Sequence, residues 1–374
     1  MSSPPAAQGG VTPRSSWMYF LVAVLVFTFA MMVVSFPVGF YTVFGTHLSS
    51  KYSASTDIAG VELDLVFGTL GVPIPGSLGA YFVGLTAIYL AFFVLAARQG
   101  TGFFGSLRRA LPDDYRALFG NPLAAMMVLL GATSFLTFVV DTFQTNAGIS
   151  TGNITGDPFE LFLDFTLAPV LEETTFRVIM IGVPVLVISL LILRGAPRGM
   201  VLRALWRPSS VWDTDEEEGD AVRSFSDATP SIFPDREYDS LKVRALKPVV
   251  YTFLGISSLL FGYAHYASGS GWGPGKISEA ALAGLFLGYL YIKYGFSANI
   301  LLHWSVNYVG SVFSFLGQGV YGVPWTSATG SYLDIIPTVE IIFLLGVPST
   351  YVVALAIAKR SARRSRPGLD SPTA

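Results

Sequence analysis

Two carboxylates and an arginine lie side by side in an otherwise apolar stretch of the chain. Residues 171–177 read LEETTFR, inside LFLDFTLAPVLEETTFRVIMIGVPVLVISLLIL. On a helix, Glu173 and Arg177 are i,i+4 neighbours and are predicted to form an ion pair, whereas Glu172 points about 100° away from that pair. A charged side chain at the centre of a membrane helix costs about 2.5–3.5 kcal/mol. The unpaired Glu172 therefore calls for a chemical explanation.

The histidines are few, and two of them lie in apolar segments. The chain has no cysteine and three histidines, His47, His265 and His303, which excludes thiol nucleophiles and cysteine-ligated metal sites. His47 lies beside a loop and is interpreted as interfacial. His265 ends the stretch FGYAH, and His303 begins HWSVN, where His303 and Asn307 share one helix face.

Together these groups match two kinds of hydrolytic site. One Glu, two His and one Asn supply a base for water and hydrogen-bond donors for an oxyanion, as peptide-bond hydrolysis requires. One Glu and two His also match the three protein ligands of a catalytic zinc. Taken singly, His265 and the pair of His303 with Asn307 are also consistent with hydrogen bonds between packed helices, whereas a structural role does not explain Glu172.

The composition indicates a polytopic membrane protein. The 374 residues are 52% hydrophobic and 13% charged, compared with about 25% charged in a typical soluble domain. We predict an all-α transmembrane helical bundle of about eight spans, with the candidate site inside the membrane. The predicted spans are 17–40, 79–97, 122–141, 159–194, 247–267, 278–293, 296–317 and 335–358. Pro169 and Pro184 are expected to kink or break the fourth span, which is too long for one straight crossing.

The distribution of Lys and Arg predicts the orientation. The connections 98–121 and 195–246 and the C-terminal tail are rich in these residues, whereas 142–158 and 318–333 contain none. By the positive-inside rule, both termini of this multi-pass protein are predicted to be cytoplasmic.

Residues 195–246 also contain the acidic run WDTDEEEGD and many Ser, Asp and Pro residues. This composition predicts a solvated cytoplasmic loop, peripheral to the site; a regulatory or partner-docking role is the alternative.

The three clusters, in this order, resemble the motifs of the CPBP family of intramembrane proteases. That family includes type II CAAX prenyl endopeptidases of the Rce1 kind and bacteriocin-processing proteins. Its motifs EExxxR, FxxxH and HxxxN or HxxxD appear here as EETTFR (172–177), FGYAH (261–265) and HWSVN (303–307). The resemblance covers about residues 159–310.

Roles for individual residues follow from this resemblance. It implies that Glu172 is the general base and acts with His265 on the attacking water, while His303 and Asn307 hold the developing oxyanion. It also implies that supporting and packing positions surround them: Glu173 and Arg177 hold Glu172 in place, and Phe261 belongs to the packing of the motif. No cofactor is required in this interpretation. If zinc is used instead, its ligands would be Glu172, His265 and His303.

The implied activity is that of an intramembrane endopeptidase, a hydrolase that acts on a membrane-associated peptide or protein substrate, with or without a prenyl group. The expected partners are this substrate and the lipid bilayer, with no nucleic acid. Two other classes stay open: a non-proteolytic family member that acts as a scaffold or immunity protein, and a transporter whose Glu and His residues relay ions or protons.

Three regions are predicted along the chain. Residues 1–121 hold two spans and a cytoplasmic loop, 122–318 form the catalytic helical core with the acidic insertion, and 319–374 hold the last span and a basic tail. This topology places His265 and His303 at depths that differ by about 15 Å along straight helices. A catalytic site therefore requires either a buried turn at Tyr294-Gly295 or strongly tilted helices.

Overall fold

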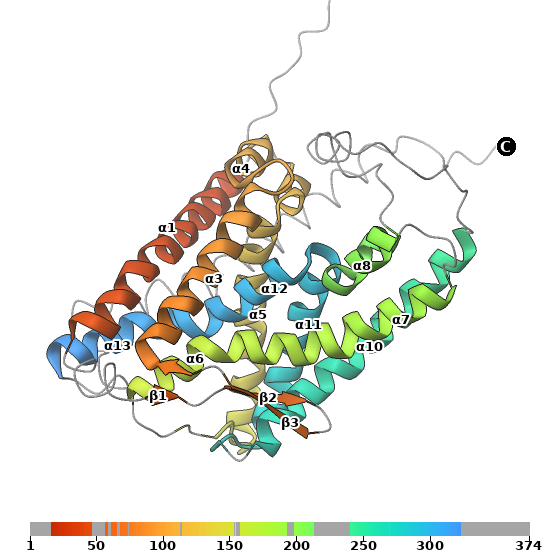
Figure 1. Cartoon of the computed structure of the whole chain (residues 1–374). Coiled ribbons are helices and arrows are strands. Elements are labelled where there is room, and N and C mark those ends of the chain that lie inside the picture. The colour runs from red at the N-terminus through yellow and green to blue at the C-terminus, as the bar shows by residue number, and fades with distance from the viewer. Residues whose placement is uncertain are drawn as a thin grey trace, which may run out of the picture.

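The predicted all-α membrane bundle is confirmed in the computed structural model, whose helices are shown in Figure 1. The structure describes residues 16–46, 57–58, 61–65, 68–73, 75–112, 114–152, 154, 158–192, 198–212, 240–268 and 270–322. Within these residues, six helical segments are long and apolar enough to cross a membrane: Met18–Gly45, Leu78–Arg98, Pro122–Asn146, Leu161–Ile192, Leu246–Ala267 and Phe296–Val320.

These six segments correspond to six of the eight predicted spans. The predicted span 278–293 forms helix α11 (Gly275–Tyr294), which is not among the six. The predicted span 335–358 lies outside the described residues, as do His47, most of the acidic run and the basic tail.

Three long helices, α1 (Ser16–Gly45), α3 (Leu78–Arg98) and α5 (Pro122–Asn146), form the N-terminal part of the bundle. Asn121 fixes the start of α5: its side-chain oxygen accepts a hydrogen bond from Ala124 N at 3.0 Å, as an N-cap does. Its amide also donates to the Ala96 carbonyl of α3 at 2.9 Å. One buried asparagine thus joins two helix ends, beside the short helices α4 (Phe103–Ala110) and η1 (Tyr115–Gly120).

Between α1 and α3 the chain forms small antiparallel β-pairs that the sequence analysis did not predict. Strand β1 (Asp57–Ile58) pairs with β4 (Gly76–Ser77), and β2 (Val61–Leu65) pairs with β3 (Gly68–Val72) in the register Val61↔Val72 to Leu65↔Gly68. The connection between the first two predicted spans, 17–40 and 79–97, therefore contains short β-strands, and the helical class of the protein is unchanged.

The fourth span is continuous but changes helix type in its middle. Helix α6 (Pro158–Glu173) contains Pro169 and leads into a π-helix, η2 (Thr174–Gly182), which is followed by α7 (Val183–Ile192). Neither proline ends the span. Instead the π-helix lies between them and begins directly after the two glutamates. A π-turn shifts the faces on which the flanking residues lie, and π-turns often occur at functional sites.

The prediction of a solvated loop over residues 195–246 is wrong at both ends of that range, where the structure has helices. Residues Arg198–Trp206 form α8 and Pro208–Val211 form η3, and their side chains Ala204 and Val211 are buried in a core cluster with α11. At the other end, Ser240–Ala267 form a single long helix, α10. The alternation of apolar and basic residues in 198–207 was outweighed by the acidic run, which directed the interpretation toward a solvated loop.

The C-terminal part of the described chain holds the central helix of the bundle. Helix α11 ends at Gly295, and α12 (Phe296–Trp304) then continues through a second π-helix, η4 (Ser305–Val309), into α13 (Gly310–Tyr321). About 65% of the most apolar part of this span is buried, against 33–44% in the other five.

Trp304 anchors this central helix in the core. Its ring stacks on Phe36, Tyr89 and Tyr308 with centroid separations of 5.0, 5.2 and 4.8 Å. Because consecutive residues of a helix point in different directions, a tryptophan fixed in this way sets the direction of the neighbouring His303.

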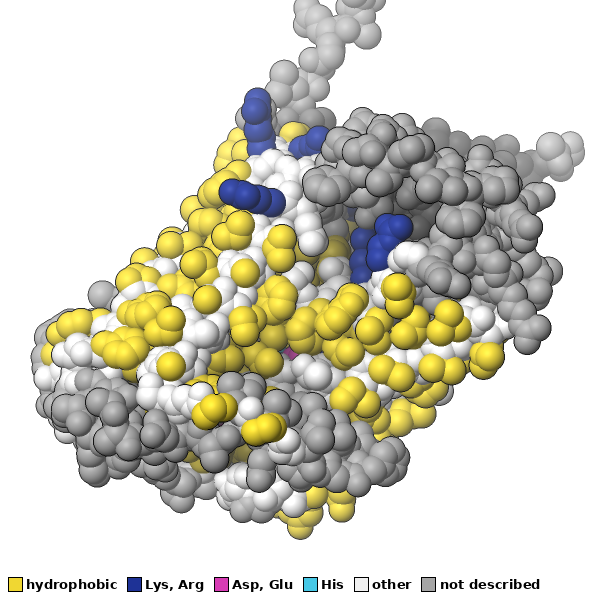
Figure 2. Space-filling model, viewed as in Figure 1, with side chains coloured by type: hydrophobic (Ala, Val, Ile, Leu, Met, Phe, Trp, Pro, Cys, Tyr) yellow, Lys and Arg dark blue, Asp and Glu magenta, His cyan; other side chains and the backbone are white. Residues whose placement is uncertain are grey.

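Large apolar side chains are widely exposed on the outside of the bundle, as expected for helices in contact with lipid. Figure 2 shows hydrophobic side chains spread over the visible face, with Lys and Arg gathered toward the end that carries α4 and α8.

Candidate active site

Glu172 and the two intramembrane histidines converge on one point. The Oε2 atom of Glu172 lies 3.6 Å from Nε2 of His303 and 3.9 Å from Nε2 of His265. These three residues come from α6, α12 and α10. The side chain of Glu172 is 30% exposed, against 17% for His265 and 7% for His303. Both gaps exceed a direct hydrogen bond, so Glu172 faces the two imidazoles without bonding directly to either.

The hydrogen bonds behind the two imidazoles fix which nitrogen carries a proton. His265 Nδ1 lies 2.9 Å from the Phe261 carbonyl, which can only accept, so this nitrogen is the donor. His303 Nδ1 lies 2.8 Å from Oε1 of Glu173. Because this carboxylate is ion-paired with Arg177, it also accepts. In the neutral form, both histidines therefore present the lone pair of Nε2 to Glu172.

Three acceptor atoms that face one another require something positive between them. A proton on one imidazole, the hydrogens of a water molecule, or a metal cation each meets this requirement. The first two correspond to a site that activates water, and the third to a zinc site. The cluster is therefore built to bind a proton, a water molecule or a cation.

Glu173 is buried beneath the site and supports it structurally. The ion pair predicted from the i,i+4 spacing is present, with Glu173 Oε2 at 3.0 Å from Nε of Arg177 and both side chains fully buried. The same carboxylate holds His303 through its other oxygen. The two adjacent glutamates thus divide their functions: Glu173 is used by the protein interior, and Glu172 faces the convergent point.

Phe261 forms a common wall for the site. Its ring meets the imidazoles of His265 and His303 edge-on, at centroid distances of 4.7 and 5.8 Å. The guanidinium of Arg177 lies over the same ring, 4.9 Å from its centroid. Phe261 is thus fixed by both charged and aromatic neighbours, and it limits where each imidazole can turn.

A buried turn brings the two histidines to the same depth. The turn at Gly295, with φ of 92°, lies under α8, where a side chain at this position would meet Trp206 O at 3.1 Å. Arg207 Nε donates to Lys293 O at 3.0 Å, and Tyr294 donates from its hydroxyl to Phe119 O at 3.0 Å. Because α8 and η1 cover the turn, α12 begins inside the protein and carries His303 to the end of α10.

Asn307 is the predicted site residue that the hydrogen bonds do not join to the cluster. It lies in η4, four residues after His303, and is half-buried. Its carbonyl accepts from Ser311 Oγ at 2.6 Å, and no hydrogen bond between described residues involves its side-chain amide. Its role as an oxyanion donor stays a prediction.

Asn299 was missed by the sequence analysis. It is fully buried one turn before His303, and its amide faces the Glu173 carboxylate. The two groups lie close enough to interact, but neither the oxygen nor the nitrogen of the amide makes a hydrogen bond of good geometry to a described residue. The spacing of Asn299, His303 and Asn307, each four apart, was the signal that could have identified it.

The donor set fits zinc in kind, although the spacing is wider than zinc requires. Each histidine has its Nδ1 hydrogen held by an acceptor, as zinc-ligating histidines usually do. Ligands at about 2.0–2.1 Å on a tetrahedral zinc lie about 3.3 Å apart, which is less than either separation from Glu172. No group of three or more His, Asp or Glu side chains in the part of the chain that the structure describes is spaced to hold a metal ion.

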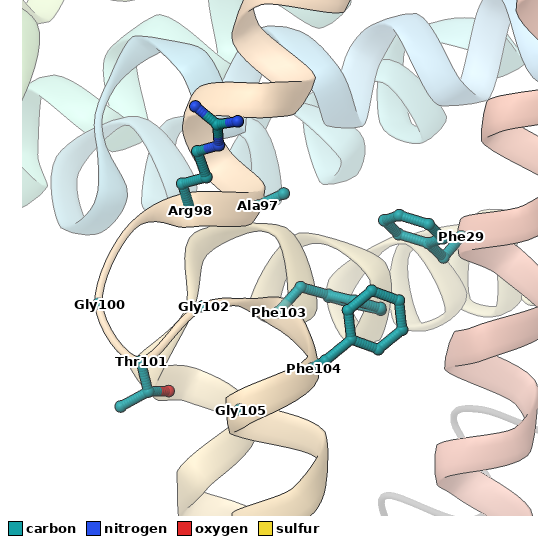
Figure 3. Close-up of a pocket in the computed structure, with 9 residues that line it drawn as sticks. All are labelled: Phe29, Ala97, Arg98, Gly100, Thr101, Gly102, Phe103, Phe104 and Gly105. Carbon is teal, nitrogen blue, oxygen red and sulfur yellow. The ribbon is translucent and has the colours of Figure 1, made fainter.

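A hollow of about 460 Å³ lies elsewhere, at the corner between α3 and α4. In Figure 3, Phe29 and Phe104 lie on one side of it, and the Arg98 guanidinium points away from them. None of the predicted site residues lines this hollow, so it is separate from the cluster around Glu172.

Comparison with known proteins matches one part of the chain to a family. No curated protein and no solved structure gives a significant match to the chain. Residues 155–309 match the model of the family described as type II CAAX prenyl endopeptidase Rce1-like. This range contains all three motifs and the convergent groups. The resemblance predicted from the motifs is thereby confirmed: residues 155–309 are similar to the Rce1-like type II CAAX prenyl endopeptidase family.

Proposed function

We propose that this protein is an intramembrane endopeptidase that hydrolyses a peptide bond of a membrane-associated substrate by means of an activated water molecule. The observation that carries the proposal is the convergence of Glu172, His265 and His303 on one partly exposed point, inside a bundle of apolar helices. A polar, water-accessible cluster at membrane depth is costly unless it serves a function.

In the first step, a water molecule held between Glu172 and His265 attacks the carbonyl carbon of the scissile bond. One of these two acceptors takes the proton that the water loses as the new C–O bond forms. The proton then passes to the leaving amine when the C–N bond breaks. Glu172 is suited to this exchange because its Oε2 accepts no hydrogen bond from any described residue.

The oxyanion that develops during the attack requires hydrogen-bond donors. His303 donates from Nδ1 to Glu173, so it can donate from Nε2 as well only as an imidazolium. The buried carboxylate of Glu173 stabilises that charge. Asn307, on the same helix face, supplies the second donor through its side-chain amide.

A zinc-dependent route is the alternative that the same residues allow. Glu172, His265 and His303 would then hold the ion, which would supply a Lewis acid and a more acidic bound water. The separations of 3.6 and 3.9 Å around Glu172 favour the water-activated route.

The test is a cleavage assay on purified protein in detergent, with a panel of prenylated and unprenylated peptides. Wild type is compared with Glu172→Gln, and with Asp114→Asn as a control carboxylate, which is exposed at the start of η1 and makes no capping hydrogen bond there. Parallel reactions contain a zinc chelator.

We expect cleavage by wild type and by Asp114→Asn, and none by Glu172→Gln. Cleavage that survives in Glu172→Gln would contradict the proposal. Comparison of the prenylated and unprenylated peptides identifies the substrate class, and the chelator reactions separate the two routes.

A further inference from the structure

Ser257 links two parts of the site that lie far apart in the sequence. It is fully buried on α10, two turns before His265. Its hydroxyl accepts a hydrogen bond from Nη1 of Arg177 at 2.9 Å and donates to the carbonyl of Phe176. Arg177 and Phe176 both belong to the π-helix η2. One serine on α10 thus fixes the segment that follows the two glutamates.

The guanidinium of Arg177 depends on this serine for its orientation. Arg177 Nε lies at ion-pair distance from Glu173, but neither this nitrogen nor Nη2 makes a well-directed hydrogen bond to a described residue. The Ser257 hydroxyl therefore accepts the one directed side-chain hydrogen bond of Arg177 within the described part of the chain. Without this bond, only the ion pair with Glu173 and the contact with the Phe261 ring would orient the guanidinium.

The consequences reach the reacting groups through Glu173. Its Oε2 contacts Arg177 and its Oε1 holds His303, so any rotation of the guanidinium changes how the carboxylate is shared between the two. His303 in turn faces Glu172 across 3.6 Å. The contacts thus form a continuous path of four side chains from Ser257 to the imidazole.

We propose that Ser257 is a positioning residue for catalysis: it holds Arg177 against Glu173 and thereby fixes the imidazole of His303 in the orientation that the reaction needs. This inference rests on the proposed function. Ser257 itself touches neither Glu172 nor the convergent point, so it acts only through its neighbours.

The next residue in the chain provides a matched control. Ser258 is 1% exposed, and its hydroxyl donates to the Leu254 carbonyl of its own helix at 2.7 Å. Ser257→Ala and Ser258→Ala therefore remove the same group from the same buried helix. Only the first removes contacts with η2.

We expect Ser257→Ala to lower kcat about tenfold to a hundredfold with little change in KM, as is usual when a group that orients a reacting side chain is lost. Ser258→Ala should retain nearly the wild-type kcat. Ser257→Thr keeps the hydroxyl and should recover most of the activity. Equal kcat values in the two alanine variants, with wild type active, would overturn the inference and leave the proposed function intact.

A second measurement does not depend on activity. The chain has three histidines, so imidazole ¹⁵N resonances of the protein in detergent can be assigned with single His→Ala variants. The resonances of His303 should shift in Ser257→Ala and stay unchanged in Ser258→Ala. Thermal unfolding of both variants shows whether they are folded. Unchanged His303 resonances in a folded Ser257→Ala protein would contradict the inference even if no substrate is cleaved.

Discussion

Oε1 of Glu173 lies 2.8 Å from Nδ1 of His303, although the two residues are 130 positions apart in the chain. This contact means that the second glutamate of the EETTFR motif orients the imidazole that faces the first. The two adjacent carboxylates are therefore parts of one assembly in which one is structural and the other faces the reacting groups.

Replacement of Glu173 by Gln should lower the stability of the protein, whereas the same replacement at Glu172 should affect mainly its activity. Glu173→Gln removes the charge opposite a fully buried arginine, and breaking a buried ion pair in this way typically costs about 3–5 kcal/mol. Glu172→Gln removes a partly exposed carboxylate that accepts no hydrogen bond at Oε2, so it should leave stability nearly unchanged while it abolishes cleavage.

Thermal unfolding in detergent, together with the cleavage assay, checks this contrast. A stable and active Glu173→Gln protein, or a Glu172→Gln protein that unfolds like Glu173→Gln, would show that the division of functions is wrong.

Much of the fold could be predicted because a bilayer imposes simple requirements on sequence. The apolar run 79–97 became Leu78–Arg98, since a helix is the form in which a short segment satisfies its own backbone in lipid. The first span extends to Gly45, beyond the predicted residue 40, and in this last part the Thr42 hydroxyl donates to the Val38 carbonyl of the same helix. Segment 198–212 could not be predicted, because its burial depends on partners in α11.

For the site, residue types and spacing identified the groups but not their arrangement. The ion pair of Glu173 with Arg177 follows from their i,i+4 spacing. The same helical geometry predicts that Glu172 points away from this pair. The contact of Glu173 with His303 and the role of Ser257 depend on how α6, α10 and α12 cross. These crossings depend on the two π-helices and on the covered turn at Gly295, for which the sequence carries no periodic signal.

Asn307 should matter for the rate and not for the fold. Removal of one oxyanion donor typically lowers kcat by about a hundredfold to a thousandfold, and Asn307 is half-buried without a hydrogen bond from its amide to a described residue. Asn307→Ala should therefore lose kcat at nearly constant KM and unfold at the wild-type temperature.

Steady-state kinetics of Asn307→Ala beside Asn146→Ala, at the exposed end of α5, gives the comparison. If both variants keep the wild-type kcat, Asn307 is not an oxyanion donor.

Metal removal should leave activity within about twofold of the untreated protein. The expectation follows from the distances around Glu172, which are wider than those between ligands of one zinc ion. Activity after treatment with a strong chelator, and the metal content of the purified protein by mass spectrometry, provide the measurement. One equivalent of zinc per chain, with activity that is lost on chelation and restored by zinc, would establish the metal-dependent route instead.

The position of His265 depends on how closely α10 approaches α11, and Gly262 sets that distance. A side chain at Gly262 would meet the backbone of α11 at Ile277 O and at Ala281 N, the latter at 2.9 Å. Gly262→Ala should therefore push the two helices apart. This would displace His265, which lies three residues after Gly262, and lower activity strongly.

Gly255, on the same helix, provides the matched control, because a side chain there would meet nothing within 4 Å. Gly255→Ala should retain full activity and unfold at the same or a slightly higher temperature, since alanine favours a helix by about 1 kcal/mol over glycine. Kinetics and thermal unfolding of both variants test the argument. Wild-type activity in Gly262→Ala would show that the approach of α10 to α11 does not position His265. Loss of activity in both variants would show that α10 tolerates no added side chain, whether or not it faces α11.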